Sequence, residues 1–208
     1  MNPLTEIFYL DTDSKAHNPI GSNIFFNLPK GARSLCQECR TPITWNANWD
    51  NVELEIIGDT THYYPDYISG NYSIISQRLL DDLVNAEASG FKAHAVGIIG
   101  VESKKLRSQQ APKYFIMEIF GGIDLDREKW DKFDGNLCSI CKTWRPRKGG
   151  TVSWGDKQKV PLMNSWDGSD FMKFKNVKIG GDLCSRKILK LAQVKKWSGF
   201  GVRAILPG

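Results

Sequence analysis

The chain has 208 residues, 41% of them hydrophobic and 25% charged, with a formal net charge of +5. These are ordinary values for a globular protein, and they exclude an intrinsically disordered chain. The modest positive charge is compatible with an acidic partner, but it is too small to indicate the strongly basic surface of a dedicated nucleic-acid protein.

We expect this sequence to carry no targeting signal. No stretch approaches the ~20 consecutive apolar residues of a membrane-spanning helix, and we therefore expect no membrane partner. The segment from Met1 to Glu6 lacks a basic region followed by an apolar run, so we expect no secretory signal. Paired cysteines without an export signal favour a cytoplasmic location, where metal binding is more common than disulfides.

Strands and turns dominate the first part of the chain. Residues 7–10 form an apolar run that stops at the turn-forming Asp11-Thr12-Asp13 cluster, which predicts a short strand. Residues 51–56 alternate apolar and polar side chains, the pattern of a half-buried strand. The first Cys-x-x-Cys pair, Cys36 and Cys39, lies between these two strands.

A segment with one histidine and three tyrosines follows at residues 60–67. Because tyrosine is favoured in binding hot spots and loops carry function disproportionately, we expect a partner-binding surface here. Its candidate residues are His62, Tyr63, Tyr64 and Tyr67. The alternative for His62 is an exposed loop histidine that is only solvated.

Residues 76–91 predict a helix that leads into a strand. Ser76 is a suitable N-cap, and Ser89-Gly90 supplies the C-terminal stop. The apolar stripe at helical spacing consists of Leu79, Leu80, Leu83 and Val84. Two further strands are expected, from Phe91 to Ile99 and from Tyr114 to Phe120.

The second part of the chain repeats this plan. Four pairs of segments match in order: Cys36-x-x-Cys39 with Cys138-x-x-Cys141, Asp66-Tyr67-Ile68 with Asp170-Phe171-Met172, Asn71 to Ile74 with Asn176 to Ile179, and Ser89-Gly90-Phe91 with Ser198-Gly199-Phe200. A helix with the stripe Ile188, Leu191, Ala192 and Val194 precedes the last match, and a strand is expected from Val202 to Leu206. The shared order predicts an α+β fold of two similar halves, residues 1–110 and 111–208. The alternative is chance recurrence of common turn motifs.

The paired cysteines predict one structural zinc ion shared by the two halves. Two Cys-x-x-Cys knuckles complete the four-thiolate shell of a closed zinc site, and its ligands would be Cys36, Cys39, Cys138 and Cys141. The alternative is loss of the metal, with the pairs acting as dithiols or packed residues. A thioredoxin-like role is disfavoured because both pairs lie in turn-rich context rather than at a helix N-terminus.

A closed shell leaves no position for water or substrate, so the expected metal holds the fold and performs no chemistry. The sequence carries no phosphate-binding loop and no nucleophile motif, and we therefore expect a protein that is not an enzyme. An enzyme that uses His62 and Asp66 is a third hypothesis.

The last predicted helix suggests an alternative function. Basic residues from Arg186 to Lys196 lie largely away from its apolar stripe, which is typical of a solvated face. Together with the knuckles they also suit a zinc-ribbon protein that binds nucleic acid. The unpaired Cys184 near the start of this helix is expected to be a small buried hydrophobe.

The order of these motifs resembles the double-CXXCG motif proteins, a paralogous bacterial family. The resemblance rests on Leu28-Pro29-x-Gly31 before the first knuckle, the second knuckle, and the closing Gly199-Phe200 and Leu206-Pro207. Arg40 and Lys142 stand where the family has glycine after each knuckle. Some members of the family are immunity proteins, so the resemblance implies a non-enzymatic, zinc-braced protein that binds and neutralises a cognate toxin.

Overall fold

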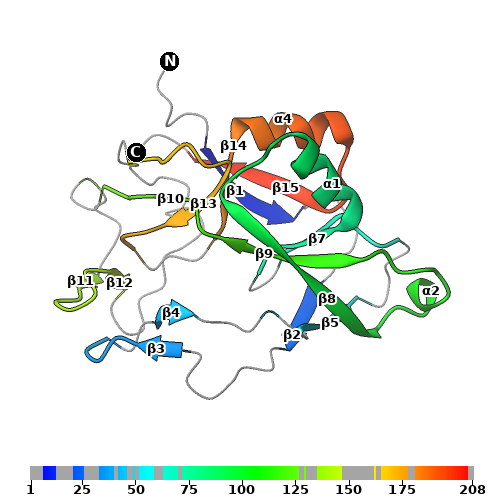
Figure 1. The fold of residues 1–208 in the computed structure, drawn as a ribbon, viewed down its shortest axis with the longest axis horizontal. Coiled ribbons are helices and arrows are strands. Elements are labelled where there is room, and N and C mark those ends of the chain that lie inside the picture. Colours follow the sequence, from blue (N-terminus) through cyan, green and yellow to red (C-terminus); the bar gives the residue numbers. More distant parts are fainter. Residues whose placement is uncertain are drawn as a thin grey trace.

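The computed structural model describes residues 7–12, 21–25, 33–39, 42–45, 49, 52–58, 63–69, 72–126, 129, 135–146, 162, 165–177 and 181–205. Over these residues the fold is mixed α and β, with many strands and few helices (Figure 1). None of the helices in these ranges is long and apolar enough to cross a membrane.

The larger sheet has six strands among the described residues. In spatial order they are β2 (Gly21–Phe25), β5 (Val52–Ile57), β8 (Phe91–Val101), β9 (Tyr114–Ile119), β7 (Ile74–Ser76) and β6 (Tyr67–Ile68). The alternation predicted near residues 51–56 is confirmed, because Val52, Leu54 and Ile56 are buried while Glu53 between them is exposed. Only β5 and β8 run parallel in this sheet.

The second large sheet has five strands in the described part of the chain. Their order is β10 (Gly122–Ile123), β13 (Phe171–Phe174), β14 (Leu183–Ser185), β1 (Ile7–Thr12) and β15 (Phe200–Ala204). Two hairpins stand apart from both sheets: β3 (Arg33–Leu35) with β4 (Pro42–Trp45), and β11 (Gly135–Leu137) with β12 (Trp144–Pro146).

The helix α1 (Gln77–Asn85) begins where the sequence predicts. Ser76 caps α1 by accepting a hydrogen bond from the Leu79 amide, 3.2 Å away, and α4 (Arg186–Lys195) follows Ser185. The short α2 (Lys104–Arg107) was not predicted. The predicted stripes were too wide, since Val84 and Val194 are 63% and 76% exposed. Each helix buries only one narrow side, and these two valines lie beyond it.

One hydrophobic cluster joins the two sheets and both longer helices. It combines buried side chains from residues 1–110 with others from residues 111–208: Leu10, Tyr67, Ile75, Leu79, Leu83, Met117, Ile119, Phe171, Cys184, Ile188, Ala192 and Trp197. The helices α1 and α4 lie side by side over this cluster (Figure 1). Lys195 and the Trp197 indole both bind Asp82 of α1, at 2.7 and 2.8 Å.

Two strands are each inserted between the two strands that flank a helix. β9 lies between β7 and β8, the strands on either side of α1, and β1 lies between β14 and β15, the strands on either side of α4. Both insertions have the same register. The opposite residues are Ser76 with Tyr114, Ser185 with Ile7, Phe91 with Ile119, and Phe200 with Thr12.

Two aspartates connect the two large sheets, because each binds a serine that precedes a strand of the other sheet. Asp66 Oδ2 accepts hydrogen bonds from the amide and hydroxyl of Ser198, at 2.8 and 2.7 Å. Asp170 Oδ2 accepts from the amide and hydroxyl of Ser89, at 3.1 and 3.4 Å. We call these contacts the Asp66–Ser198 and Asp170–Ser89 latches.

A second layer of interactions surrounds each latch. Ser76 donates to Asp66 at 2.9 Å and Ser185 to Asp170 at 2.7 Å. Arg78 forms an ion pair with Asp66, and Lys187 forms one with Asp170. The two aspartates therefore occupy matching environments.

Candidate metal centre

Each Cys-x-x-Cys pair forms the turn of a short hairpin. Leu35 pairs with Pro42 across the first knuckle, and Leu137 pairs with Trp144 across the second. In the second knuckle the Lys142 amide donates to the Cys138 carbonyl at 3.1 Å. A tight turn of this kind points both sulfurs of a pair in one direction, which is the arrangement a tetrahedral metal requires.

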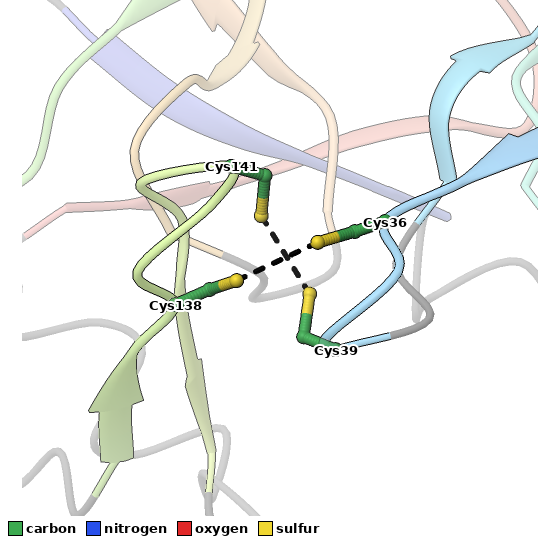
Figure 2. Close-up of side chains that lie close together, drawn as sticks. All are labelled: Cys36, Cys39, Cys138 and Cys141. Carbon is green, nitrogen blue, oxygen red and sulfur yellow. Dashed lines mark hydrogen bonds between the residues drawn. The ribbon is translucent and has the colours of Figure 1, made fainter.

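The structure brings the four predicted cysteines together. All four sulfur atoms lie within 4.8 Å of one another. Figure 2 shows two hydrogen bonds between the knuckles, from Cys36 to Cys138 at 3.5 Å and from Cys39 to Cys141 at 3.6 Å. Cys36 and Cys138 are buried, whereas Cys39 and Cys141 are half-buried.

These separations fit a single metal ion. Four sulfurs at about 2.3 Å from a central ion form a tetrahedron with edges of about 3.8 Å, close to the two sulfur–sulfur distances between the knuckles. A disulfide would require about 2.05 Å between sulfurs, and these four cysteines are not joined by disulfides. The cluster can therefore hold a metal with four thiolate ligands supplied equally by two hairpins.

Glu38 links the two knuckles in a way that the sequence did not predict. Its Oε2 accepts hydrogen bonds from the amide and hydroxyl of Ser139, at 2.9 and 2.7 Å, and from the Cys138 thiol at 3.0 Å. Glu38 is one of the two variable residues of the first Cys-x-x-Cys pair, so its identity alone gives no signal of a contact with the other hairpin.

The same hydrogen bonds shift the acidities of the groups involved. The bond from the Cys138 thiol, followed by that from Ser139, lowers the pKa of Glu38. The adjacent carboxylate raises the pKa of Cys138 to about 12. By contrast, hydrogen bonding by Thr143 lowers the pKa of Cys141. A bound cation would oppose the effect on Cys138, since metal ligation requires the thiolate.

The residue after the second knuckle adopts a left-handed backbone. Lys142 has a φ of 54°, a conformation that glycine adopts without strain and other residues do not. This is one of the two positions where the double-CXXCG family has glycine. The other, Arg40, lies outside the described residues.

The second hairpin is fastened to the segments that follow β13 and β10. The Trp144 amide donates to the Asn176 carbonyl at 2.9 Å, and the Asn176 side chain exchanges two hydrogen bonds with the Leu125 backbone, at 2.8 and 2.9 Å. The Trp144 ring also packs against the cluster that contains Leu125. The position of Cys138 and Cys141 is therefore tied to the core.

The predicted partner-binding residues are separated by the structure. Tyr63 is 50% exposed, while Tyr64 is half-buried and donates to the Leu106 carbonyl at 3.0 Å. Tyr67 is only 3% exposed, and its hydroxyl is hydrogen-bonded to Ser73 at 2.9 Å, so it offers no surface to a partner. His62 lies outside the described residues.

The remaining candidates take structural positions. Cys184 is fully buried, as predicted, and burial raises the pKa of its thiol. On α4, Lys187 binds Asp170 and Lys195 binds Asp82, at 3.0 and 2.7 Å. Two cations of the face suggested for nucleic acid are thus engaged within the fold.

Comparisons with known proteins add no relative to this picture: no protein-family model and no curated protein matches the chain.

Proposed function

We propose that this protein is a non-enzymatic, zinc-braced binding protein that neutralises a cognate toxin domain. The zinc-braced structure is supported by the cluster of four thiols, two from each of two hairpins. The facing cysteines of these hairpins lie 102 residues apart in sequence. Four protein ligands complete the shell of zinc, and the ion then acts as a cross-link. The toxin partner is supported by the resemblance to the double-CXXCG family.

The cross-link couples metal binding to folding. The unfolded chain has no assembled site, so the free energy of metal binding stabilises only the folded state. Purified protein treated with a strong chelator should lose its zinc and unfold at a lower temperature, and returning zinc should restore both. Unchanged thermal unfolding after complete zinc removal would contradict the bracing role.

Internal duplication is the architectural part of the proposal. It is supported by the shared register of β1 and β9, by the two latches, and by the matching knuckle hairpins. Each half would contribute its first strand to the sheet of the other. The register also favours Ile74–Ser76 and Leu183–Ser185 as counterparts, rather than the Asn71 and Asn176 segments suggested by the sequence.

Such an exchange suits a rigid scaffold. The latches, the shared core and the metal all connect the two halves, so no single loop determines how the halves are arranged. A preorganised surface loses less entropy when it binds a partner. This is the property required of an inhibitor that acts by steric occlusion.

The toxin partner is tested by co-expression. The protein should restore growth to cells that express the toxin domain encoded beside its own gene, and the two purified proteins should form a stable complex. An unrelated toxin serves as the control and should remain lethal. Absence of both protection and complex formation with the neighbouring toxin would refute the immunity function while leaving the zinc site intact.

A further inference from the structure

A cleft opens where β5 and β8 end, beside α2. Its volume is about 890 Å³, within the range of roughly 300–1,000 Å³ typical of ligand sites. Glu55, Ile57, Tyr64, Ile99, Glu102 and Arg107 line it. None of these residues belongs to the metal centre.

Hydrogen bonds hold the walls of the cleft in place. Arg107 Nε and Nη2 donate to the Val101 and Glu102 carbonyls, at 2.6 and 3.0 Å, which ties α2 to the end of β8. The Tyr64 hydroxyl donates to the Leu106 carbonyl at 3.0 Å. Because these groups are already ordered, a ligand need not pay the entropy of arranging them.

The cleft carries two carboxylates in a protein of net positive charge. Glu55 Oε2 accepts from Asn23 at 2.9 Å, and Glu102 Oε2 accepts from the Gly58 amide at 2.7 Å. Within the described part of the chain, neither carboxylate forms an ion pair with Arg107, whose Nε and Nη2 donate to backbone carbonyls. Two carboxylates so placed favour a cationic ligand group.

Apolar groups lie beside the carboxylates. Ile99 is 56% exposed, and Ile57 and Tyr64 line the same space. The methylene stem of a long basic side chain packs well on such surfaces, and an aromatic ring attracts the cation itself. Charge and shape together match arginine or lysine rather than a simple metal cation.

The cleft also lies where the two halves differ. β8 has 11 residues and pairs with β5 along its C-terminal part, whereas its proposed counterpart β15 has five residues and pairs with β1 alone among the described strands. The repeated framework cannot account for the cleft, so it is an addition specific to the first half.

We propose that this cleft binds an arginine or lysine side chain presented by an extended segment of a partner protein. The identification of that partner as a toxin rests on the proposed function, but the chemistry of the cleft does not. Tyr63 and Tyr64, the exposed and half-buried tyrosines of the predicted partner surface, place that surface next to the cleft.

The test is a titration of the full-length, zinc-loaded protein, followed by amide chemical shifts. The probes are two capped tripeptide amides, leucine-arginine-leucine and leucine-glutamate-leucine. The arginine peptide should shift the amides of Gly58, Gly100 and Glu102, and the glutamate peptide should not. Equal responses to both peptides, or shifts confined to other regions, would overturn the proposal.

Substitutions make the test specific. The double variant Glu55→Gln, Glu102→Gln keeps the hydrogen-bond acceptors and should weaken binding of the arginine peptide about tenfold, since it removes two partly exposed ion pairs. Glu53→Gln changes an exposed glutamate of the same strand outside the cleft and should leave binding unchanged. Wild-type affinity in the double variant would overturn the proposal.

A second variant covers the case in which the double variant does not fold. Ile99→Lys alters an exposed side chain and places a cation in the cleft, so it should abolish binding of the arginine peptide. Retained binding would count against the cleft. A protein that binds the peptide as described but fails to protect cells would refute the toxin function alone. A protein that protects cells without this peptide preference would refute the cleft alone.

Discussion

The Asp66–Ser198 latch gives the sharpest stability prediction. Burial raises the pKa of Asp66, but hydrogen bonds from Arg78, Ser198 and Ser76 outweigh it and lower the pKa from 3.8 to about 2. That difference corresponds to roughly 2 kcal/mol at neutral pH. The Arg78 side chain is 55% exposed, so solvent screening reduces its share. We expect Asp66→Asn to lower the free energy of unfolding by about 1–2 kcal/mol at pH 7.

The pH dependence follows from the direction of the shift. A folded-state pKa below the unfolded value gives stability that is present above about pH 4 and is lost as the pH falls towards 2. Urea unfolding followed by tryptophan fluorescence should therefore give the same difference in the free energy of unfolding between wild type and Asp66→Asn at pH 7 and at pH 5. This difference should become smaller only below pH 4.

The matching latch supplies the control. Asp170→Asn removes the same kinds of contact, but its hydrogen bonds to Ser89, at 3.1 and 3.4 Å, are longer than those of Asp66 to Ser198. It should therefore destabilise the protein less. A surface substitution typically changes the free energy of unfolding by no more than about 0.5 kcal/mol. If Asp66→Asn changes it by no more than that at pH 7, the latch does not have the role assigned to it.

Three further substitutions test other parts of the structure. Lys142→Gly should raise the free energy of unfolding by about 1 kcal/mol in urea titrations, because glycine removes the strain of a left-handed backbone at φ 54°. A loss of stability would contradict this. Gly199→Ala should destabilise the protein by at least about 2 kcal/mol more than Gly168→Ala. A Cβ at 199 would lie 2.4 Å from the Tyr67 carbonyl oxygen, whereas one at 168 meets nothing within 4 Å. Equal losses of unfolding free energy in the two variants would refute the close approach. Glu38→Ala removes the hydrogen bonds from Ser139 that hold the second knuckle beside the first. It should weaken zinc affinity about tenfold in competition with a chromogenic chelator, whereas unchanged affinity would show that the contact between knuckles is incidental.

Local sequence signals predicted the local structure well. Ser76 and the spacing of Leu79 and Leu83 were enough to locate α1, since capping and helical periodicity depend on residues a few positions apart. The alternation of residues 51–56 located β5 for the same reason. The two Cys-x-x-Cys pairs predicted a shared site because few other arrangements explain both pairs.

Contacts between distant segments could not be predicted in the same way. The insertion of β1 between β14 and β15 depends on pairing across nearly the whole chain, and the sequence of β1 does not specify its neighbours. Tyr67 was chosen for a surface because of its residue type, but it faces the core that both sheets share. The contacts of Glu38 form only because the second hairpin lies beside the first, and the sequence near Glu38 does not indicate this.

The central claim is that one metal ion joins the two knuckle hairpins, and the zinc content of the purified protein tests it most directly. Native mass spectrometry of the intact chain should show one zinc ion bound to each monomer, and Cys138→Ser should remove it and destabilise the whole chain. A chain that carries two zinc ions or none would contradict the account.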